Sequence, residues 1–253
     1  MPDATVKFEG ARFIITMDPT RRIIADGSLV IQGQRILQVG KAAELAQVQA
    51  DRVIDATDMV ITPGFCNGHM HISYAHATRG IFPDDLGSAY LPNVFKLQAI
   101  MTEEEEYNTS LLAITELLKY GTTTFMDPGS TKYLDRCLDA YKQTGCRIIT
   151  GTHVTDKPNP LGLPTYSTAE AIEIVETTIK HFDGQADGRI SAWAMPFDHP
   201  ARLVWSAHSP TRHHPRQQGR FVIPHDGSLR SQGTAQKEWS CAHNATHLTT
   251  TQL

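Results

Sequence analysis

Between about residue 61 and residue 197 the sequence alternates short β-favouring runs with amphipathic helical stretches. The β-favouring runs lie near residues 61, 122, 147 and 189. Strands that alternate with helices of this length predict βα units around a parallel sheet, which must be covered on both faces or closed into a barrel. We therefore expect an α/β fold with about four βα units.

The helical stretches carry their own start signals. Thr102 with Glu105, and Ser167 with Glu170, have the spacing of a capping box, in which two side chains satisfy the free N–H groups of a helix start. The acidic run Glu103–Glu106 would lie in the first turn after Thr102. Because the helix dipole favours negative charge there, we expect these four carboxylates to be solvent-exposed rather than a functional cluster.

Residues 1–60 have a different rhythm, with brief β-favouring runs separated by glycines. This pattern predicts a small antiparallel sheet that forms part of a β-sandwich. Ile31 to Ile36 reads as a hairpin with Gly33 at its turn, and residues 42–50 could form a short helix.

Residues 198–253 follow neither a strand period nor a helix period for long, so we expect an irregular or disordered basic tail. The tail is rich in histidine and holds the following members of the chain's 12 histidines: His199, His208, His213, His214, His225, His243 and His247. Its abrupt onset leads to the hypothesis of a frame-shifted or otherwise foreign end on a truncated gene. The expected domains are thus 1–60, 61–197 and 198–253.

Composition limits the binding partners and the cellular compartment that we expect for this protein. A net charge of -4 gives no general attraction to nucleic acid or to an anionic membrane. The sequence shows neither a signal peptide nor an apolar run of membrane-spanning length. Its four cysteines form no CxxC pair, which favours a reducing, cytoplasmic setting over a disulfide framework. Self-association as a homo-oligomer stays open.

The run from Ile61 to His71 carries the strongest chemical signal, because an apolar segment passes through Pro63-Gly64 and ends in a His-x-His pair. In an extended chain, side chains two residues apart point to the same side, so His69 and His71 would lie on one face of the segment. Two imidazoles make half of a metal site, since a catalytic zinc ion takes about three protein ligands and keeps one position open. Taken alone the pair would more often be two ordinary histidines; its place between a strand and a βα series favours metal ligation.

These residues resemble the signature of the amidohydrolase superfamily, most closely the branch of cytosine, guanine and adenosine-derivative deaminases and triazine hydrolases. The resemblance covers about residues 6–197. The matching segments are Asp26-Gly27, Ile36–Gly40, Ile54–Ala56, Val60–His71, Arg79-Gly80, Asp84-Asp85 and Glu116–Asp127.

The resemblance implies a TIM-like (β/α)8 barrel beside a small β-sandwich, with one divalent metal ion at the barrel mouth. Zinc is favoured, with iron, manganese or cobalt as alternatives, and His69 and His71 map onto its first two ligands. In this superfamily the other ligands and a proton-shuttling glutamate follow later strands, for which this sequence offers no positions. We therefore expect only part of the barrel and leave the catalytic acid and base unassigned.

The implied reaction is metal-dependent hydrolysis of a C–N bond other than a peptide bond, foremost deamination of a small nitrogen heterocycle. Hydrolysis of a cyclic or linear amide or a urea-type bond is the alternative within this chemistry. A chain that is an inactive fragment, or a simple metal-binding remnant, is the alternative from another class.

Three further residues are candidates for substrate binding. Asp127 and His153 each end a predicted strand, where a barrel directs side chains to its active site, and Arg79 lies in the loop after the first strand. Structural hydrogen bonding would explain Asp127 and His153 equally well. For Arg79, fixing of that loop by an Arg-Asp pair is favoured over substrate contact.

Overall fold

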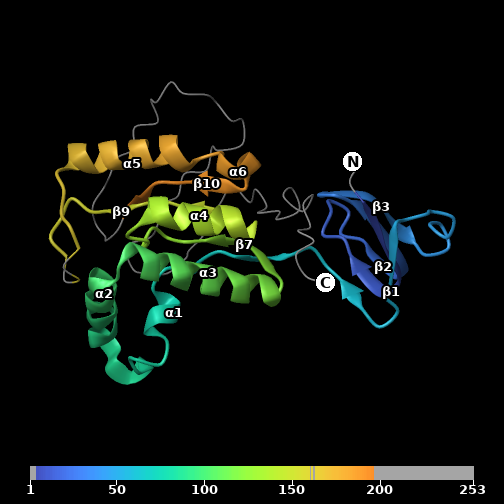
Figure 1. Cartoon of the computed structure of the whole chain (residues 1–253), viewed down its shortest axis with the longest axis horizontal. Coiled ribbons are helices and arrows are strands. Elements are labelled where there is room, and N and C mark those ends of the chain that lie inside the picture. The colour runs from blue at the N-terminus through green and yellow to red at the C-terminus, as the bar shows by residue number, and fades with distance from the viewer. Residues whose placement is uncertain (1–3, 160, 162, 197–253) are drawn as a thin grey trace, which may run out of the picture. The chain divides into compact units, whose positions relative to one another are not determined.

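The computed structural model describes residues 4–159, 161 and 163–196 (Figure 1). Within these residues two compact units are distinguished. The first contains the chain up to Gly68 together with Thr115–Phe125, and the second contains His69–Ile114 and the chain from Met126 onward. The predicted boundaries at residues 60 and 197 stay a prediction, and the predicted tail, 198–253, lies outside the described residues.

The first unit is built on one sheet whose central strand is β1 (Thr5–Ile15). Strands β2 (Ile23–Gln32) and β3 (Arg35–Lys41) follow as an antiparallel meander in which Ile31 pairs with Ile36 and Gly33 occupies the turn at φ 53°. This is the predicted hairpin. The sheet's apolar face forms a core of six buried residues, namely Ala11, Ile14, Ile24, Leu29, Ile31 and Ala56.

Three local expectations for this region are wrong. The sheet is mixed, because β4 (Arg52–Asp55) and β5 (Val60–Ile61) both pair parallel to β1. The run near residue 61 therefore belongs to this sheet, and the first strand of the barrel sheet is β6 (Phe65–Asn67). Residues 42–47 form turns and residues 48–50 have no regular structure, so the predicted helix is absent. So short a segment with a single buried anchor, Leu45, cannot offset the cost of helix nucleation.

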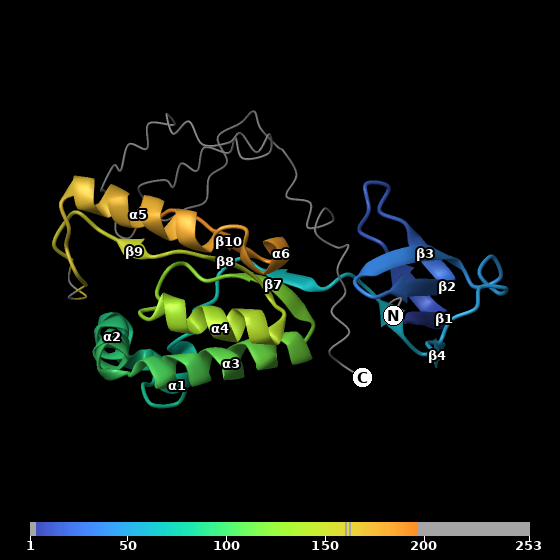
Figure 2. The same ribbon diagram turned by 45° about the horizontal axis from the view of Figure 1, so that its top comes forward.

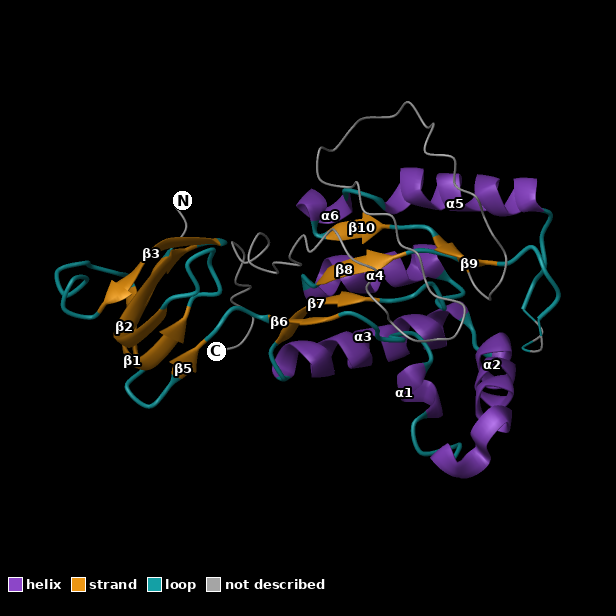
Figure 3. Cartoon of the chain, turned by 180° about the vertical axis from the view of Figure 1, so that it is seen from behind, coloured by secondary structure: helices purple, strands orange, loops and turns teal. Residues whose placement is uncertain are grey.

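The second sheet has the strand order β10-β8-β7-β6, with β7 (Thr122–Met126), β8 (Arg147–Thr150) and β10 (Ile190–Ala192). Pairs β6–β7 and β8–β10 are parallel. Figure 3 shows all four strands side by side in this order, and Figure 2 shows β10, β8 and β7 from another side. Two further short strands, β9 (His153–Val154) and β11 (Met195–Pro196), pair with each other in parallel. This arrangement confirms the predicted α/β class with a partial barrel.

The runs predicted near residues 147 and 189 each form two short strands instead of one. The breaks follow Thr150 and Ala192. There the backbone at Gly151 lies close to the neighbouring segment, since a Cβ at Gly151 would be 2.4 Å from the backbone oxygen of Trp193. Only a residue without a side chain fits there.

Helices connect the strands of the second sheet. Between β6 and β7 come α1 (Ala75–Thr78), the 3₁₀ helix η1 (Asp84–Ala89), α2 (Tyr90–Ile100) and α3 (Glu103–Lys119). Later connections hold α4 (Leu134–Thr144), α5 (Thr168–Phe182) and α6 (Gln185–Gly188). No helix in the described part of the chain has the length and apolar character needed to cross a membrane.

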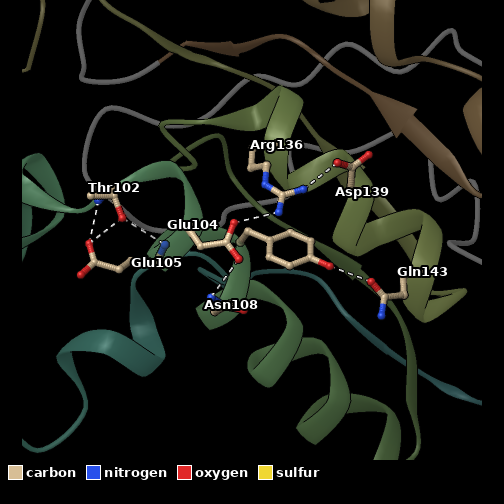
Figure 4. Close-up of polar contacts among 8 residues, drawn as sticks. Thr102, Glu104, Glu105, Asn108, Arg136, Asp139 and Gln143 are labelled. Atoms are coloured by element: carbon tan, nitrogen blue, oxygen red, sulfur yellow. Dashed lines mark hydrogen bonds and ion pairs between the residues drawn. The ribbon is translucent and has the colours of Figure 1, made fainter.

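Both predicted capping boxes are present. The Thr102 N–H donates to Glu105 Oε2 at 2.8 Å and the Glu105 N–H donates back to Thr102 Oγ1 at 3.3 Å (Figure 4). Ser167 and Glu170 make the same reciprocal pair at the start of α5. Figure 4 also shows Arg136 of α4 between Glu104 of α3 and Asp139, with both ion pairs at 2.8 Å.

One carboxylate of the acidic run contradicts the expectation of solvent exposure. Glu106 is fully buried in α3, and it accepts hydrogen bonds from Gln98 Nε2 at 3.1 Å, from the Lys132 N–H at 3.0 Å and from the Tyr133 N–H at 2.5 Å. The two backbone donors belong to the loop between β7 and α4. Because a buried carboxylate is stable only when donors surround it, Glu106 and this loop fix one another.

We expect Glu106→Gln to lower the free energy of unfolding by about 2 kcal/mol, because an amide NH₂ would face backbone N–H donors that then lose their acceptor. Urea denaturation measures the change, and Glu103→Gln, at an exposed position in the same helix turn, is the matched control. Equal stability of the two variants would contradict this role for Glu106.

Candidate functional site

The ends of three chain segments in the second unit are joined by single backbone hydrogen bonds. Met70 N–H donates to the Met126 carbonyl at 2.8 Å, Asp127 N–H to Ile149 at 2.9 Å, and His153 N–H to Gly129 at 2.9 Å. Gly129 permits the last approach, because its φ is +94° and a Cβ there would lie 2.9 Å from the His153 nitrogen. These bonds gather the residues that follow β6, β7 and β8.

His69 and His71 follow β6 and converge, as the spacing predicts. Their Nε2 atoms lie 3.2 Å apart, and the rings meet edge to face with centroids 4.8 Å apart. Met70 between them takes part in the backbone pairing, so the two flanking side chains leave the chain on the same side. His69 is exposed, whereas His71 is partly buried.

The ring of His71 is held by side chains that the sequence did not reveal. Its Nδ1 lies 2.8 Å from Ser130 Oγ, and its face stacks on Tyr74 with centroids 5.1 Å apart and an interplanar angle of 26°. Ser130 Oγ in turn donates to Asp127 Oδ1 at 3.2 Å. Ser130 is 59 residues from His71 along the chain, and no sequence spacing marks such a pair.

Burial sets the protonation of the site. It lowers the pKa of His71 to about 4, with the neighbouring His69 and His153 contributing in the same direction. It also lowers the pKa of His153 to about 4, against a hydrogen bond to the Pro128 carbonyl that raises it. Complete burial raises the pKa of Asp127 to about 6, although the hydroxyls of Thr131 and Ser130 oppose the shift. Neutral imidazoles, the form that ligates metals, are therefore favoured.

The three residues predicted to bind substrate occupy different surroundings. Asp127 is fully buried and accepts from Thr131 Oγ1 at 2.5 Å as well as from Ser130. His153 is partly buried and close enough to His69 and His71 to affect the pKa of the latter. Arg79 is exposed and follows α1. Their role in substrate binding stays a prediction.

Known proteins resemble this chain in sequence. The sequence model of the amidohydrolase family matches residues 60–201. A 5'-deoxyadenosine deaminase of Methanobrevibacter smithii is 30% identical over 197 residues, which is 78% of this chain and 42% of that protein. A 5-methylthioadenosine/S-adenosylhomocysteine deaminase of Carboxydothermus hydrogenoformans is 30% identical over 184 residues, 71% of this chain and 40% of that protein.

Solved structures show the same fold. An atrazine chlorohydrolase from Arthrobacter aurescens TC1, complexed with zinc, superposes with a TM-score of 0.62 at 21% identity, covering 77% of this chain and 47% of that one. Guanine deaminase of E. coli gives a TM-score of 0.54 at 20% identity, with 75% and 44% covered. The chain spans less than half the length of these relatives.

The chain belongs to the amidohydrolase family, because the model of that family matches more than half of its residues. Family membership also supports a divalent metal ion as cofactor. His69 and His71 fit such an ion: two imidazole nitrogens on one tetrahedral zinc ion lie about 3.4 Å apart, given Zn–N bonds of about 2.0–2.1 Å. Their observed separation is 3.2 Å.

The fit extends to two ligands only. Within residues 4–159, 161 and 163–196, no cluster of three or more His, Cys, Asp or Glu side chains has an arrangement that could hold a metal ion. The role of His69 and His71 as metal ligands therefore stays a prediction.

We expect the buried histidines to make folding sensitive to mild acid. Because the folded-state pKa of His153 is about 4 and its ordinary value is 6.5, only the unfolded chain binds a proton between these pH values, so stability falls as the pH drops through this window. When the pH is lowered from about 7 to about 5, the free energy of unfolding should decrease in both proteins. The decrease should be smaller in His153→Asn than in the parent by on the order of 1 kcal/mol.

Urea denaturation at both pH values measures this difference, with His181→Asn, an exposed histidine on α5, as control. Asp127 has a raised pKa and shifts stability in the opposite direction, but it is common to both proteins and cancels in the comparison. An identical pH dependence of parent and His153→Asn would contradict the assignment.

Proposed function

We propose that this chain contributes to a metal-dependent hydrolase that cleaves C–N bonds other than peptide bonds, foremost in the deamination of a nitrogen heterocycle. The observation that carries the proposal is the convergence of the His69 and His71 Nε2 atoms at 3.2 Å, at a strand end of a chain that belongs to the amidohydrolase family. The chain covers about two fifths of its deaminase relatives, so the activity concerns the whole protein that carries these residues.

His69 and His71 would hold the ion through their Nε2 atoms. When bound, a divalent ion supplies the activation of a water molecule for attack on an electron-poor carbon. The low pKa of His71 keeps its ring neutral at neutral pH, which leaves the nitrogen lone pair available. We propose zinc as the metal, because the related chlorohydrolase structure contains it and imidazole ligands suit it; iron, manganese and cobalt are alternatives.

The substrate proposal draws on the relatives. Two of them are named as deaminases of adenosine derivatives, which carry an exocyclic amine on an electron-poor purine ring. We therefore propose a small purine derivative as substrate, with His153 and Arg79 as candidate contacts. Asp127 supports this role least, because both of its oxygens already accept hydrogen bonds within the protein.

Amide or urea-type hydrolysis by the same machinery is the alternative reaction. The half-site favours a second candidate, in which the 253-residue chain binds a metal ion without turnover. We also propose a cytoplasmic setting, in line with the free thiols of Cys66, Cys137 and Cys146, while a homo-oligomer stays an open proposal.

The purified chain should bind zinc, and the whole protein that carries it should bind zinc and release ammonia from 5'-deoxyadenosine. His69→Ala should weaken zinc binding by more than about tenfold, since loss of a ligand costs at least as much as loss of a residue that supports one. Elemental analysis and chelator competition measure the metal, and an ammonia assay measures turnover. His181→Ala, which alters an exposed histidine bonded to Asp135, should leave both unchanged.

Zinc binding that is equal in His69→Ala and the parent would contradict the proposed ligand. Zinc binding without ammonia release from 5'-deoxyadenosine, other adenosine derivatives or guanine would favour the second candidate.

A further inference from the structure

We propose that Ser130 is a positioning residue for the metal site: it accepts the Nδ1–H of His71, donates its own proton to Asp127, and thereby fixes the His71 tautomer whose bare Nε2 faces His69. The inference rests on the proposed metal site, but the tautomer can be measured without any metal. Ser130 itself touches neither metal nor substrate in this role and acts through His71.

The hydrogen-bond capacity of the Ser130 hydroxyl determines the direction of each bond. A hydroxyl has one proton to donate and two lone pairs that accept. Asp127 Oδ1, at 3.2 Å, takes the proton because an ionised carboxylate only accepts. The lone pairs then remain for His71 Nδ1 at 2.8 Å, so His71 must donate. If Ser130 donated to His71 instead, a bare hydroxyl oxygen would face the carboxylate.

The hydrogen bonds from His71 to Ser130 and from Ser130 to Asp127 form a relay, and its final acceptor, Asp127, is itself fixed. Asp127 Oδ2 accepts from Thr131 Oγ1 at 2.5 Å, and the backbone N–H groups of Gly129 and Ser130 also bond to this carboxylate. Oδ1 therefore stays directed at Ser130. A carboxylate whose oxygens are held in this way provides a stable end point for the proton of the hydroxyl.

Ser130 is also anchored from its other side. Its carbonyl accepts from Gln98 Nε2 at 2.5 Å, and Gln98 is in turn held by the buried Glu106 at 3.1 Å. The two loop residues that follow Thr131, Lys132 and Tyr133, donate to the same Glu106 carboxylate. The position of the Ser130 hydroxyl is thus set by α2 and α3 as well as by its own loop.

The relay fixes ring orientation as well as tautomer. A half-turn of the His71 ring about its Cβ–Cγ bond would place a carbon opposite Ser130 and turn Nε2 away from His69. This rotation is unfavourable because it would break the hydrogen bond between His71 and Ser130, and stacking on Tyr74 restricts the plane of the ring. Partners on the distal nitrogen of a histidine commonly set the orientation and basicity of a metal ligand in this way.

The first test is the His71 tautomer in the metal-free, full-length chain, measured by ¹⁵N NMR of labelled histidine above neutral pH. The parent should show the Nδ1–H form. Ser130→Ala should shift His71 toward the Nε2–H form that free imidazole side chains prefer, and Ser130→Thr, which keeps the hydroxyl, should restore the parent spectrum. The matched control is Ser110→Ala, which alters a buried serine of α3 that donates a hydrogen bond to Cys137 of α4.

The second test is zinc affinity by competition with a chromogenic chelator. Ser130→Ala should bind zinc about 10- to 100-fold more weakly than the parent, whereas Ser130→Thr and Ser110→Ala should bind it like the parent. An unchanged tautomer together with unchanged zinc affinity in Ser130→Ala would overturn the proposal.

The outcomes separate this inference from the proposed function. A parent chain that binds no zinc removes the proposed metal site, yet the tautomer experiment still decides the role of Ser130. An Nε2–H tautomer of His71 in the folded parent overturns the positioning role without the use of any variant, including the case in which Ser130→Ala does not fold.

Discussion

Parallel pairing is the constraint on which the rest of the structure depends. Parallel strands run in one direction, so the residues that follow them meet at one edge of the sheet. Here the edge is extended by the three backbone bonds that join Met70 to Met126, Asp127 to Ile149 and His153 to Gly129. Residues widely separated in sequence, among them His71, Asp127 and His153, are brought together by these main-chain bonds and not by their own side-chain chemistry.

The loop after β7 holds the side chain of His71 in place, because it carries Ser130. Burying Glu106 would be costly without partners, and the donors of Gln98, Lys132 and Tyr133 offset that cost. The same bonds hold the loop that carries Ser130, the partner of His71. Packing between α3 and the loop therefore contributes to stability and to the geometry of a candidate metal ligand at the same time, which links the fold of the second unit to its chemistry.

The features predicted from the sequence are those with local signals. The capping boxes at Thr102 and Ser167 and the His-x-His spacing involve residues two or three apart, where backbone geometry decides which side chains meet. The family resemblance predicted the family, and the family match confirms it. The roles of His69 and His71 stay a prediction.

What the sequence did not predict depends on distant partners. Glu106 has the same local pattern as its exposed neighbours and differs only because the loop 130–133 lies over it. The apolar run near residue 61 satisfies the preference of either sheet, and pairing with β1 assigned it to the first. The tertiary environment, and not the residue type, determines the burial of Glu106 and the sheet that the run near residue 61 joins.

The two histidines of the half-site differ in how much order they already have. His71 is restrained on its Nδ1 edge by Ser130 and on its face by Tyr74, whereas His69 is exposed to solvent. Ordering an exposed side chain costs conformational entropy when a ligand binds, and a restrained one has already lost it. An ion that meets this pair would therefore find one fixed ligand in His71, and His69 would contribute most of the conformational cost.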